Sequence, residues 1–478
     1  MVNKPPTSLL DTLASRLGAS GFTRDPNDMA PWLEDWRGRY RGAAAAMLSP
    51  GTTEEVAAIV RACADARVAL VPQGGNTSMV GGATPRAEGD ALLLSLRRMN
   101  RIRSISAASN VAVCEAGVIL SNLHDAAEAV GRRFPLTLGA KGSATIGGLA
   151  STNAGGTQVL RFGTMRGLVA GIEAVLPDGS VFNGIAPLKK DSRGYDLRQL
   201  LIGAEGTLGV ITAASLRLVP AIAERCVAWI GLSSPQIALR LLRLFEERTG
   251  DAVESFELVP RSALDLVLEH IAAARKPLVG SHEWNVLVEA VASGSGTDLA
   301  ARVAAVLEEA IAGELIEDAV IAASEAQAND FWRLRDSISE AERQGSPGPR
   351  HDISVEVDVM PSFMVDAASA VEARFPGTRV VAFGHLGDGN VHFNVGSPHG
   401  RDPAWMAETG AAVTALVDDL VVAAGGSISA EHGIGQSRLE EFARLGDPVR
   451  LHALRAIKRA LDPIGIMNPG KLVPLAER

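Results

Sequence analysis

The chain has 478 residues, of which 47% are hydrophobic and 21% are charged, a balance typical of a soluble globular protein with large apolar cores. A formal net charge of −9 and the lack of a basic cluster exclude a general affinity for nucleic acid. No apolar stretch is long enough to span a bilayer, the first residues do not resemble a secretory signal, and the three cysteines form no CxxC pair. We therefore expect a cytoplasmic enzyme of two or three domains.

The first part of the chain alternates short strands and helices with glycine-rich loops. An apolar run at residues 68–71 predicts a buried strand that leads into the loop PQGGNTSMVGG at 72–82. Two more glycine-rich stretches cover residues 139–171 and 203–212. This alternation predicts one α+β domain over residues 1–220.

After residue 220 the chain consists of strand–helix units. Strands are expected at residues 226–232, 284–291, 353–359 and 380–383, and helices at 235–248, 298–312 and 362–375. Units of this kind, joined by hairpin pairing, predict an antiparallel sheet that helices cover on one face. We assign this second α+β domain to residues 221–424 and a C-terminal segment to residues 425–478.

Three glycine-rich stretches in one domain favour a large cofactor that carries phosphate. Glycine lets backbone amides converge on an anion and approach it closely, as in a phosphate-binding nest. A single loop of this kind would indicate only a glycine-rich turn. No GxGxxG motif follows an expected strand, so the sequence does not support nicotinamide binding.

The segment GHLGDGNVHFNV predicts a metal site. If Asp388 and Gly389 are the central residues of a tight primed turn, His385 lies directly opposite His392. Opposed residues on one face have β-carbons about 5 Å apart, so both imidazoles point the same way. Asn394 shares that face. Two adjacent histidines and a carboxylate from elsewhere form an open metal site, whereas the alternative is two half-buried polar residues satisfied by hydrogen bonds.

Two other segments supply candidate polar groups. Glu431 and His432, in the motif SAEHGIG, are candidates for the missing carboxylate and for an acid–base group. Arg335 and Ser339 are spaced i, i+4 on a helix expected at 324–343, so they share a face. The planar guanidinium of Arg335 suits a carboxylate ligand, although a solvated, salt-bridged helix is the plainer interpretation.

Six motifs occur in an order that resembles a known flavoprotein family. They are VPQGGNTSMVGG, LGAKGSATIGGLASTNAGGT, KKDSRGYDLRQLLIGAEGTLGVIT, GHLGDGNVHFNV, SAEHGIG and MNPGK. Over residues 48–474 the chain is similar to the FAD-linked oxidases of the vanillyl-alcohol-oxidase superfamily, and most similar to the D-2-hydroxyacid dehydrogenases among them. The segments LGAKGS, KDSRGYDLRQL and RHDISV resemble the D-2-hydroxyglutarate dehydrogenases more than the D-lactate or glycolate enzymes.

The resemblance implies an α+β fold: a PCMH-type FAD-binding domain of two subdomains, an antiparallel-sheet substrate domain covered by helices, and a C-terminal segment that packs back on the FAD domain. It implies non-covalent FAD, since Asn76 stands in the region where some relatives attach the flavin through a histidine. The residues that it implies for FAD binding are Pro72, Gly74, Gly75, Asn76, Thr77, Gly81, Gly82, Gly139, Gly142, Ser143, Thr145, Gly148, Asn153, Gly156, Gly163, Glu205, Gly206, Gly209, Val210, Ile211 and Asn468.

For the chemistry, the resemblance implies oxidation of a D-2-hydroxy acid, most simply D-2-hydroxyglutarate, by hydride transfer to the flavin N5. It implies a divalent metal, expected to be zinc, on His385, His392 and Glu431. Asn394 would hydrogen-bond the substrate, and His432 would bind it and act as the base.

Arg335, Ser339 and Arg350 correspond to positions that bind the distal carboxylate of 2-hydroxyglutarate in the family. Ser339 stands for threonine and Arg350 for lysine, so hydroxyl and charge are retained while reach and geometry change. D-lactate or another D-2-hydroxy monoacid therefore stays an alternative substrate, as does the role of a glycolate-oxidase-like subunit. From the residues alone, a metallohydrolase without flavin also stays open. The expected partners are the small 2-hydroxy acid and an electron acceptor, either an electron-transfer flavoprotein or a quinone or cytochrome. A homodimer is the assembly we consider.

Overall fold

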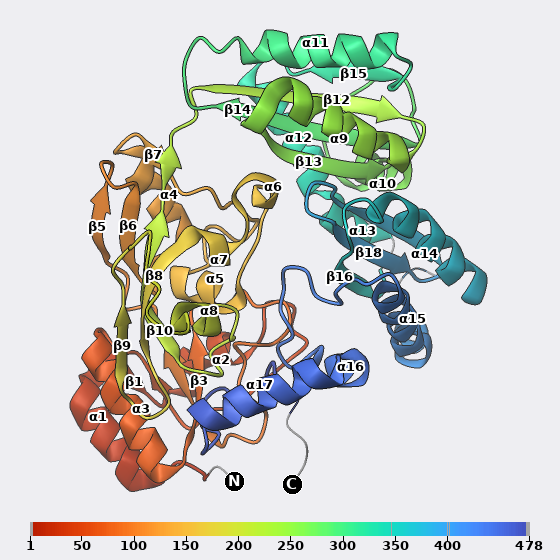
Figure 1. Cartoon of the computed structure of the whole chain (residues 1–478). Helices are drawn as coiled ribbons and strands as arrows, with labels where there is room; N and C mark the ends of the chain where they lie inside the picture. Colours follow the sequence, from red (N-terminus) through yellow and green to blue (C-terminus); the bar gives the residue numbers. More distant parts are fainter. Residues whose placement is uncertain (1–2, 346, 399, 401, 475–478) are drawn as a thin grey trace. The chain divides into compact units, whose positions relative to one another are not determined.

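The computed structural model describes residues 3–345, 347–398, 400 and 402–474 (Figure 1). The chain divides into two compact units. The first consists of Met1–Gly156, Gly163–Ala221 and Glu431–Arg478, and the second of Thr157–Phe162 and Ile222–Ala430. Among the described residues, no helix combines the length and the apolar composition needed to cross a bilayer.

The first unit contains a four-stranded sheet with one antiparallel pair of strands at one edge and two parallel pairs beside it. Its strands, in spatial order, are β1 (Phe22–Thr23), β2 (Met47–Leu48), β4 (Ala91–Ser95) and β3 (Ala69–Gln73). Strands that are buried on both faces need unbroken apolar sequences, and β4 reads ALLLS. The helices α1 (Thr7–Gly21) and α3 (Thr53–Ala66) share one apolar core with this sheet.

A second sheet of the first unit is antiparallel throughout. Its strands, in spatial order, are β5 (Ile102–Ser106), β6 (Val111–Glu115), β10 (Val210–Arg217), β8 (Val169–Val175) and β9 (Val181–Gly184). The short strands β7 (Arg132–Arg133) and β11 (Val219–Pro220) form a separate pair. Further helices of this unit are α2 (Pro26–Leu33), α4 (Leu120–Glu128), α5 (Ile146–Thr152), α7 (Met165–Leu168), α8 (Leu197–Leu201), α16 (Leu439–Leu445) and α17 (Pro448–Leu461).

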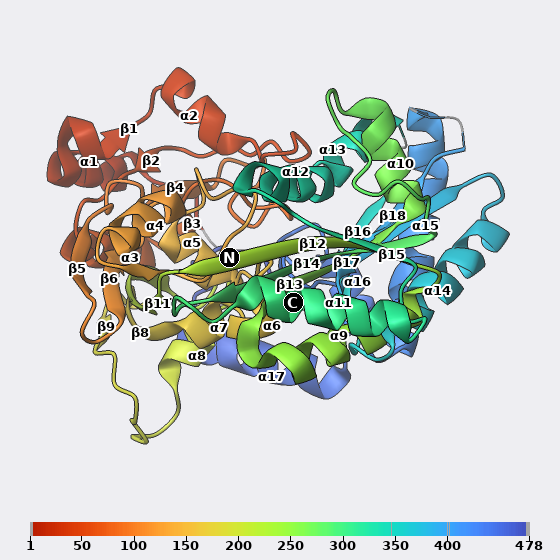
Figure 2. The ribbon, with the colours of Figure 1, turned by 90° about the horizontal axis from the view of Figure 1, so that it is seen from above.

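The second unit is built on a seven-stranded antiparallel sheet (Figure 2). Its strands, in spatial order, are β15 (Asp318–Ile321), β12 (Glu224–Leu232), β14 (Trp284–Ala292), β13 (Val253–Pro260), β17 (Arg379–His385), β18 (Asn390–Gly396) and β16 (Arg350–Ser354). Every strand pair in it is antiparallel. The predicted antiparallel sheet is therefore confirmed.

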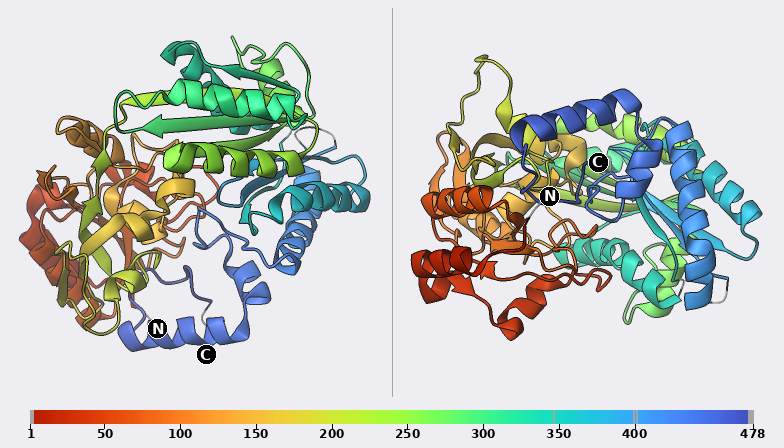
Figure 3. Two further views of the ribbon diagram at one scale, coloured as in Figure 1. Left: turned by 45° about the horizontal axis from the view of Figure 1, so that its top comes forward. Right: turned by 90° about the horizontal axis from the view of Figure 1, so that it is seen from below.

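Helices cover both faces of this sheet, so the expectation that they cover one face is wrong. On one face Phe256 of β13 packs against Phe245 of α9 (Pro235–Thr249), with the ring centroids 6.3 Å apart. On the other face Val259 of the same strand shares a core with Phe331 and Ile338. The first layer contains α9, α11 (Leu299–Ala312), α14 (Met360–Arg374) and α15 (Pro403–Ala423), and the second contains α10 (Arg261–His270), α12 (Glu325–Asp336) and α13 (Ile338–Gly345) (Figure 3). The short helix α6 (Val159–Phe162) also belongs to this unit.

The wrong expectation has a physical reason. The strands β13 and β14 are buried along almost their whole length. This includes Glu257 and Glu289, whose carboxylates bind Arg335 and Trp332 of α12. A sheet with two covered faces shows no simple alternation of apolar and polar residues. The sequence pattern alone therefore does not reveal whether helices cover one face or both.

Candidate active site

The hairpin that carries both histidines has a different register from the one expected. His385 pairs with Asn390, and Phe383 pairs with His392. The expectation that His385 lies directly opposite His392 is therefore wrong. The reversal is a four-residue loop at 386–389 rather than a two-residue turn.

The wider loop is closed by its own backbone. The amides of Asp388 and Gly389 both donate to the carbonyl of His385, at 3.3 and 3.1 Å. Gly389 has a φ of +78°, and a β-carbon there would lie 2.0 Å from the carbonyl oxygen of Val355. Only glycine fits this position, so the DG pair marks the end of the loop and not its centre.

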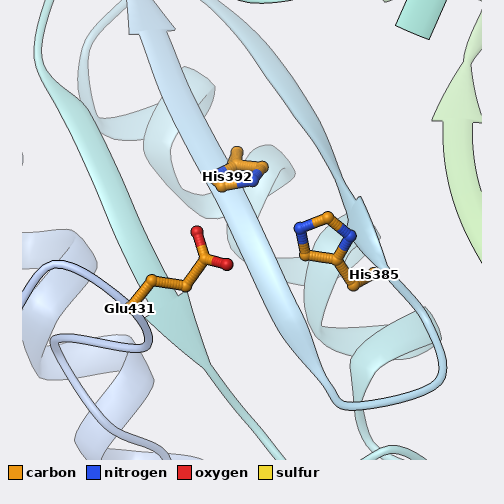
Figure 4. Close-up of side chains that lie close together, drawn as sticks. All are labelled: His385, His392 and Glu431. Carbon is orange, nitrogen blue, oxygen red and sulfur yellow. The ribbon is translucent and has the colours of Figure 1, made fainter. Parts of the chain in front are cut away.

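The two imidazoles nevertheless lie on the same face of the sheet. The register differs from the expected one by two residues, and side chains in a strand alternate with a period of two. The ring centroids of His385 and His392 are 5.5 Å apart, with the planes at 79°. Glu431 points toward both rings (Figure 4). One ligand atom from each of these three residues lies within 4.8 Å of the others.

Glu431 directly follows Ala430, which is hydrogen-bonded to the sheet. The amide of Ala430 donates to the carbonyl of Asp352 on β16 (3.2 Å). Asp352 is also the cross-strand partner of His392. Its side chain forms a second possible metal-binding group with Glu431 and His432. Sequence reasoning missed Asp352, although strand alternation places it on the face of Arg350, two residues earlier.

His385 is held by a buried ion pair. Its Nδ1 lies 2.6 Å from Oε1 of Glu257, and Nε of Arg335 donates to Oε2 of the same carboxylate at 2.8 Å. Burial alone would raise the pKa of Glu257, but the charges of Arg335 and His385 outweigh it and lower this pKa to about 2. An ionised carboxylate only accepts hydrogen bonds, so Nδ1 carries the proton and Nε2 is the nitrogen left for a metal.

These residues fit a divalent metal. Two imidazoles and a carboxylate are a ligand set of open catalytic zinc sites, and a carboxylate behind one of the histidines is usual there. Nη2 of Arg335 lies 3.3 Å from Nε2 of His385, so the guanidinium would place a positive charge beside that of the metal. Glu257 and Glu431 supply the opposing negative charges.

The three residues expected to bind a distal carboxylate come from three elements: Arg335 from α12, Ser339 from α13 and Arg350 from β16. The expected helix at 324–343 is interrupted at Ser337, which separates α12 from α13, so Arg335 and Ser339 do not lie on one continuous helix. Ser339 is exposed, and its backbone carbonyl accepts a hydrogen bond from Nη1 of Arg350 (3.2 Å). Arg350 is the cross-strand partner of Asn394.

Asn394 binds a carboxylate that the sequence did not reveal. Its Nδ2 donates to Oε2 of Glu342 at 2.7 Å, and the side chain of Glu342 is only 1% exposed. Burial raises the pKa of Glu342 to about 7, although the charge of Arg350 opposes this rise. No signal near Glu342 in the sequence distinguishes it from the other acidic residues of its helix.

In the first unit, two of the segments expected to bind FAD pack together. A β-carbon on Gly74 would lie 2.1 Å from Oγ1 of Thr145, and one on Gly75 would lie 1.9 Å from the carbonyl oxygen of Ser143. The loop after β3 and the segment before α5 therefore approach at backbone distance, which requires glycine.

This loop offers donors that the described part of the protein does not use. The amides of Gly75, Asn76, Thr77 and Ser78 have no acceptor among the described residues. Asn76 has a φ of +54° and turns its side chain inward, where Nδ2 donates to the carbonyl of Glu34 (2.8 Å). Successive free amides around a left-handed residue form a nest that suits an anion.

Several buried polar atoms near this loop are also without a partner in the described structure, among them Oγ1 of Thr145, Oδ1 of Asn468 and Nζ of Lys471. Asn468 uses its Nδ2 to donate to the carbonyls of Gly82 (3.0 Å) and Glu205 (2.7 Å). Buried polar atoms are costly unless they are hydrogen-bonded, so these atoms fit a polar cofactor.

The carboxylate of Glu205 is hydrogen-bonded to backbone amides. Its Oε1 and Oε2 accept the amides of Ile434 and Gly435, both at 2.8 Å. Burial raises the pKa of Glu205 to about 7, against the effect of these hydrogen bonds and of Lys471. Gly82 and Gly206 lie in the same region, since a β-carbon on Gly82 would be 3.4 Å from Oε2 of Glu205.

The other residues expected to bind FAD are spread over the first unit. Asn153 caps the C-terminus of α5 through its backbone amide. Its side-chain oxygen accepts from Thr164 and from the amide of Arg166, both at 2.9 Å, so the side chain is engaged within the protein. The remaining positions lie at the end of β3 and in the loop after it, within α5 and in the segments on either side of it, and at the start of β10: Pro72, Gly81, Gly139, Gly142, Gly148, Gly156, Gly163, Gly209, Val210 and Ile211.

Family models match both halves of the chain. An FAD binding domain matches residues 44–184, and the C-terminal domain of FAD linked oxidases matches residues 222–472, which is more than half of the 478 residues. The chain belongs to the family of FAD-linked oxidases.

Named relatives of this FAD-linked oxidase extend over almost the whole chain. The mitochondrial D-2-hydroxyglutarate dehydrogenase of Bos taurus is 38% identical over 452 residues, which cover 94% of this chain and 80% of the relative. The mitochondrial enzyme of the same name from Arabidopsis thaliana is 35% identical over 96% of this chain and 80% of its own length. The D-2-hydroxyglutarate dehydrogenase of Xanthomonas citri pv. viticola is 36% identical over 96% of each. The matches place the chain among the FAD-dependent hydroxyacid dehydrogenases of the family.

Solved structures confirm the PCMH-type fold of this FAD-linked oxidase. p-Cresol methylhydroxylase with substrate bound has a TM-score of 0.76 at 15% identity and covers 98% of this chain and 96% of its own. Alkyldihydroxyacetonephosphate synthase has a TM-score of 0.71 at 16% identity, over 98% of this chain and 85% of its own. At such identities the likeness concerns the fold alone. The names of the eukaryotic relatives place those proteins in mitochondria, so the cytoplasmic location expected for this chain stays a prediction.

Proposed function

We propose that this FAD-linked oxidase converts a D-2-hydroxy acid to the 2-oxo acid, with D-2-hydroxyglutarate as the preferred substrate and 2-oxoglutarate as the product. The relatives described above, at 35–38% identity, carry the name D-2-hydroxyglutarate dehydrogenase. The observation that carries the proposal is the grouping of His385, His392 and Glu431 within 4.8 Å, with His432 next in the chain.

The oxidation removes a hydride from Cα and a proton from the hydroxyl, which together leave a carbonyl. An alcohol is a very weak acid, so the proton needs help to leave. A divalent cation on His385, His392 and Glu431, which we propose to be zinc, would act as a Lewis acid toward a substrate hydroxyl. FAD, bound without a covalent link in the first unit, would supply the hydride acceptor.

His432 is proposed as the base that takes the hydroxyl proton. Imidazole is the side chain that most often serves as a general base, and His432 is half-buried beside Glu431. Glu257 has a supporting role because its hydrogen bond fixes the orientation and the tautomer of His385.

Substrate recognition is proposed for Asn394 and Arg350, which are cross-strand neighbours on the face of the two histidines. Arg335 stays a member of the proposed set, although its Nε already donates to Glu257. The exposed Ser339 is the least supported member of the proposed set.

A monoacid such as D-lactate is the second candidate substrate, and one observation favours it. Arg350 is the cation beside Asn394 that we assign to a distal carboxylate, and it already attracts the internal carboxylate of Glu342 electrostatically. We propose that the electron acceptor is an electron-transfer flavoprotein, a quinone or a cytochrome, and a homodimer stays a prediction.

The test is an anaerobic substrate panel. Purified protein should be yellow, and its flavin absorbance should bleach when D-2-hydroxyglutarate is added, more slowly with D-malate and D-lactate and not at all with L-2-hydroxyglutarate. Treatment with a chelator should abolish bleaching without releasing the flavin. A colourless protein, or a flavin that no 2-hydroxy acid reduces, would contradict the proposal and favour a metallohydrolase or a catalytically silent subunit.

A further inference from the structure

Glu342 is a buried carboxylate to which neither the proposed reaction nor the sequence assigns a role. It lies on α13 with 1% of its side chain exposed. Its Oε2 accepts a hydrogen bond from Nδ2 of Asn394 at 2.7 Å. A buried carboxylate is costly unless charges or hydrogen bonds compensate it, so its presence beside a proposed substrate ligand calls for an account.

Arg350 supplies part of the compensating charge, although burial still raises the pKa of Glu342 to about 7. Glu342 and Arg350 attract each other, since each shifts the protonation of the other toward the charged form. Arg350 reaches the same place from the neighbouring strand, because it is the cross-strand partner of Asn394. Its Nη1 is further held by the carbonyl of Ser339, at 3.2 Å. Glu342, Asn394 and Arg350 thus form one polar cluster.

This cluster lies on the face that carries the candidate metal ligands. Asn394 follows His392 by two residues on β18, and Arg350 precedes Asp352 by two residues on β16. Alternate residues of a strand point to the same face. A substrate whose hydroxyl end lies at the histidines would extend its other end along the strands toward Arg350.

We infer that Glu342 determines the charge class of the substrate. Its carboxylate competes with the distal carboxylate of a diacid for Arg350, while a monoacid with an apolar tail does not meet this competition. Two carboxylates that share one cation repel each other, so an internal counter-ion lowers the affinity for a second acid group. The inference rests on the proposed oxidation of D-2-hydroxy acids.

The experiment compares two substrates of equal length in the complete flavoprotein. D-2-hydroxyglutarate and D-2-hydroxyvalerate both have five carbons, but only the first has a distal carboxylate. Glu342→Gln keeps an oxygen that can accept from Asn394 and removes the charge. We expect the ratio of kcat/KM for the diacid to that for the monoacid to rise about tenfold. The change should appear as a lower KM for the diacid, with the kinetics of the monoacid almost unaltered.

Three further variants keep the test decisive. Glu340→Gln makes the same charge change at an exposed position of the same helix and should leave the ratio unaltered. Glu342→Leu fills the buried space without a charge and should raise the ratio as Glu342→Gln does, even if one of the two variants fails to fold. Adding Arg350→Gln to Glu342→Gln should abolish the gain.

The outcomes separate the inference from the proposed function. If wild-type protein oxidises neither acid, the proposed function is overturned. If wild-type protein oxidises the acids but neither Glu342 variant that folds and retains FAD shifts the ratio, or if the monoacid gains as much as the diacid, the inference about Glu342 is overturned while the proposed function stands.

Discussion

Oε1 of Glu257 lies 2.6 Å from Nδ1 of His385, although 128 residues separate them in the sequence. The same carboxylate also binds Arg335. It therefore ties a candidate metal ligand to a helix on the same side of the sheet, and it leaves Nε2 of His385 as the nitrogen for a metal.

Replacing Glu257 by glutamine should weaken both the metal site and the fold. The buried guanidinium of Arg335 would lose its counter-charge, and removal of one member of a buried ion pair costs about 3–5 kcal/mol. Loss of the carboxylate behind a metal-bound histidine lowers metal affinity by about 10–100-fold. Urea unfolding and zinc titration calorimetry would measure the two effects. Glu289→Gln, which alters a carboxylate paired with Arg225, serves as control because it should affect stability only. Unaltered zinc affinity in Glu257→Gln would refute the assigned role.

Replacing His432 by alanine should reduce turnover while leaving both cofactors bound. Removal of a general base typically lowers the rate by about 10²–10⁴-fold. Stopped-flow reduction of the flavin by D-2-hydroxyglutarate would measure the rate, and absorbance and elemental analysis would measure FAD and metal. The matched control is His452→Ala, at an exposed position on α17. Turnover equal to that of the wild type would rule out His432 as the base.

Acid precipitation should release all of the FAD into solution. Asn76 occupies the region where a histidine attaches the flavin in some relatives, and its Nδ2 donates to the carbonyl of Glu34 instead of facing outward. An amide side chain has no nucleophile for such a bond. Absorbance of the supernatant and mass spectrometry of the pellet would measure the partition. A flavin that stays with the precipitated chain would contradict non-covalent binding.

Glu205 should make the stability of the protein depend on pH. Burial raises its pKa to about 7, so the folded state binds a proton that the unfolded state has already lost at the same pH. The contribution of Glu205 to stability is therefore fully present below the unfolded pKa of about 4.3 and is lost as pH rises through about 7. The difference in unfolding free energy between wild type and Glu205→Gln should fall by up to about 1.4 kcal/mol per pH unit in this window.

Urea unfolding at several pH values would measure this difference. Glutamine keeps one acceptor for the amides of Ile434 and Gly435 and loses the other, which adds a constant offset but no slope. Glu128→Gln, at an exposed position, is the control and should show no slope. A flat difference for Glu205→Gln between pH 4.5 and 7 would count against the raised pKa.

The sequence predicted the face of the two histidines but not their pairing. A DG pair indicates a tight turn, and nothing local reveals that Gly389 must avoid the carbonyl of Val355 from another segment. The predicted register is wrong by two residues, which is one full period of a strand. Both imidazoles therefore lie on the same face of the sheet, as predicted. Local periodicity thus fixed the feature on which a metal site depends.

Glu257 and Glu342 could not be found in the same way. Their neighbours in the sequence carry no motif, and their partners His385 and Asn394 lie 128 and 52 residues away. The layer of helices over this face was missed for the same reason, since the paired carboxylates of β13 and α13 are polar residues in buried positions. Buried ion pairs form only when the tertiary structure brings their members together, so a single sequence gives no local sign of them.

The close approach of Gly75 to the backbone of Ser143 limits which substitutions the protein tolerates at residue 75. A methyl group at Gly75 would collide with a carbonyl oxygen and not with a side chain that could turn away, so no rotamer change nearby can compensate for it. An inherited change from Gly75 to any larger residue would force two distant stretches of chain apart at once. Such a variant should bind little FAD and therefore lack the yellow colour of the flavin. A second mutation could restore binding only by moving the backbone.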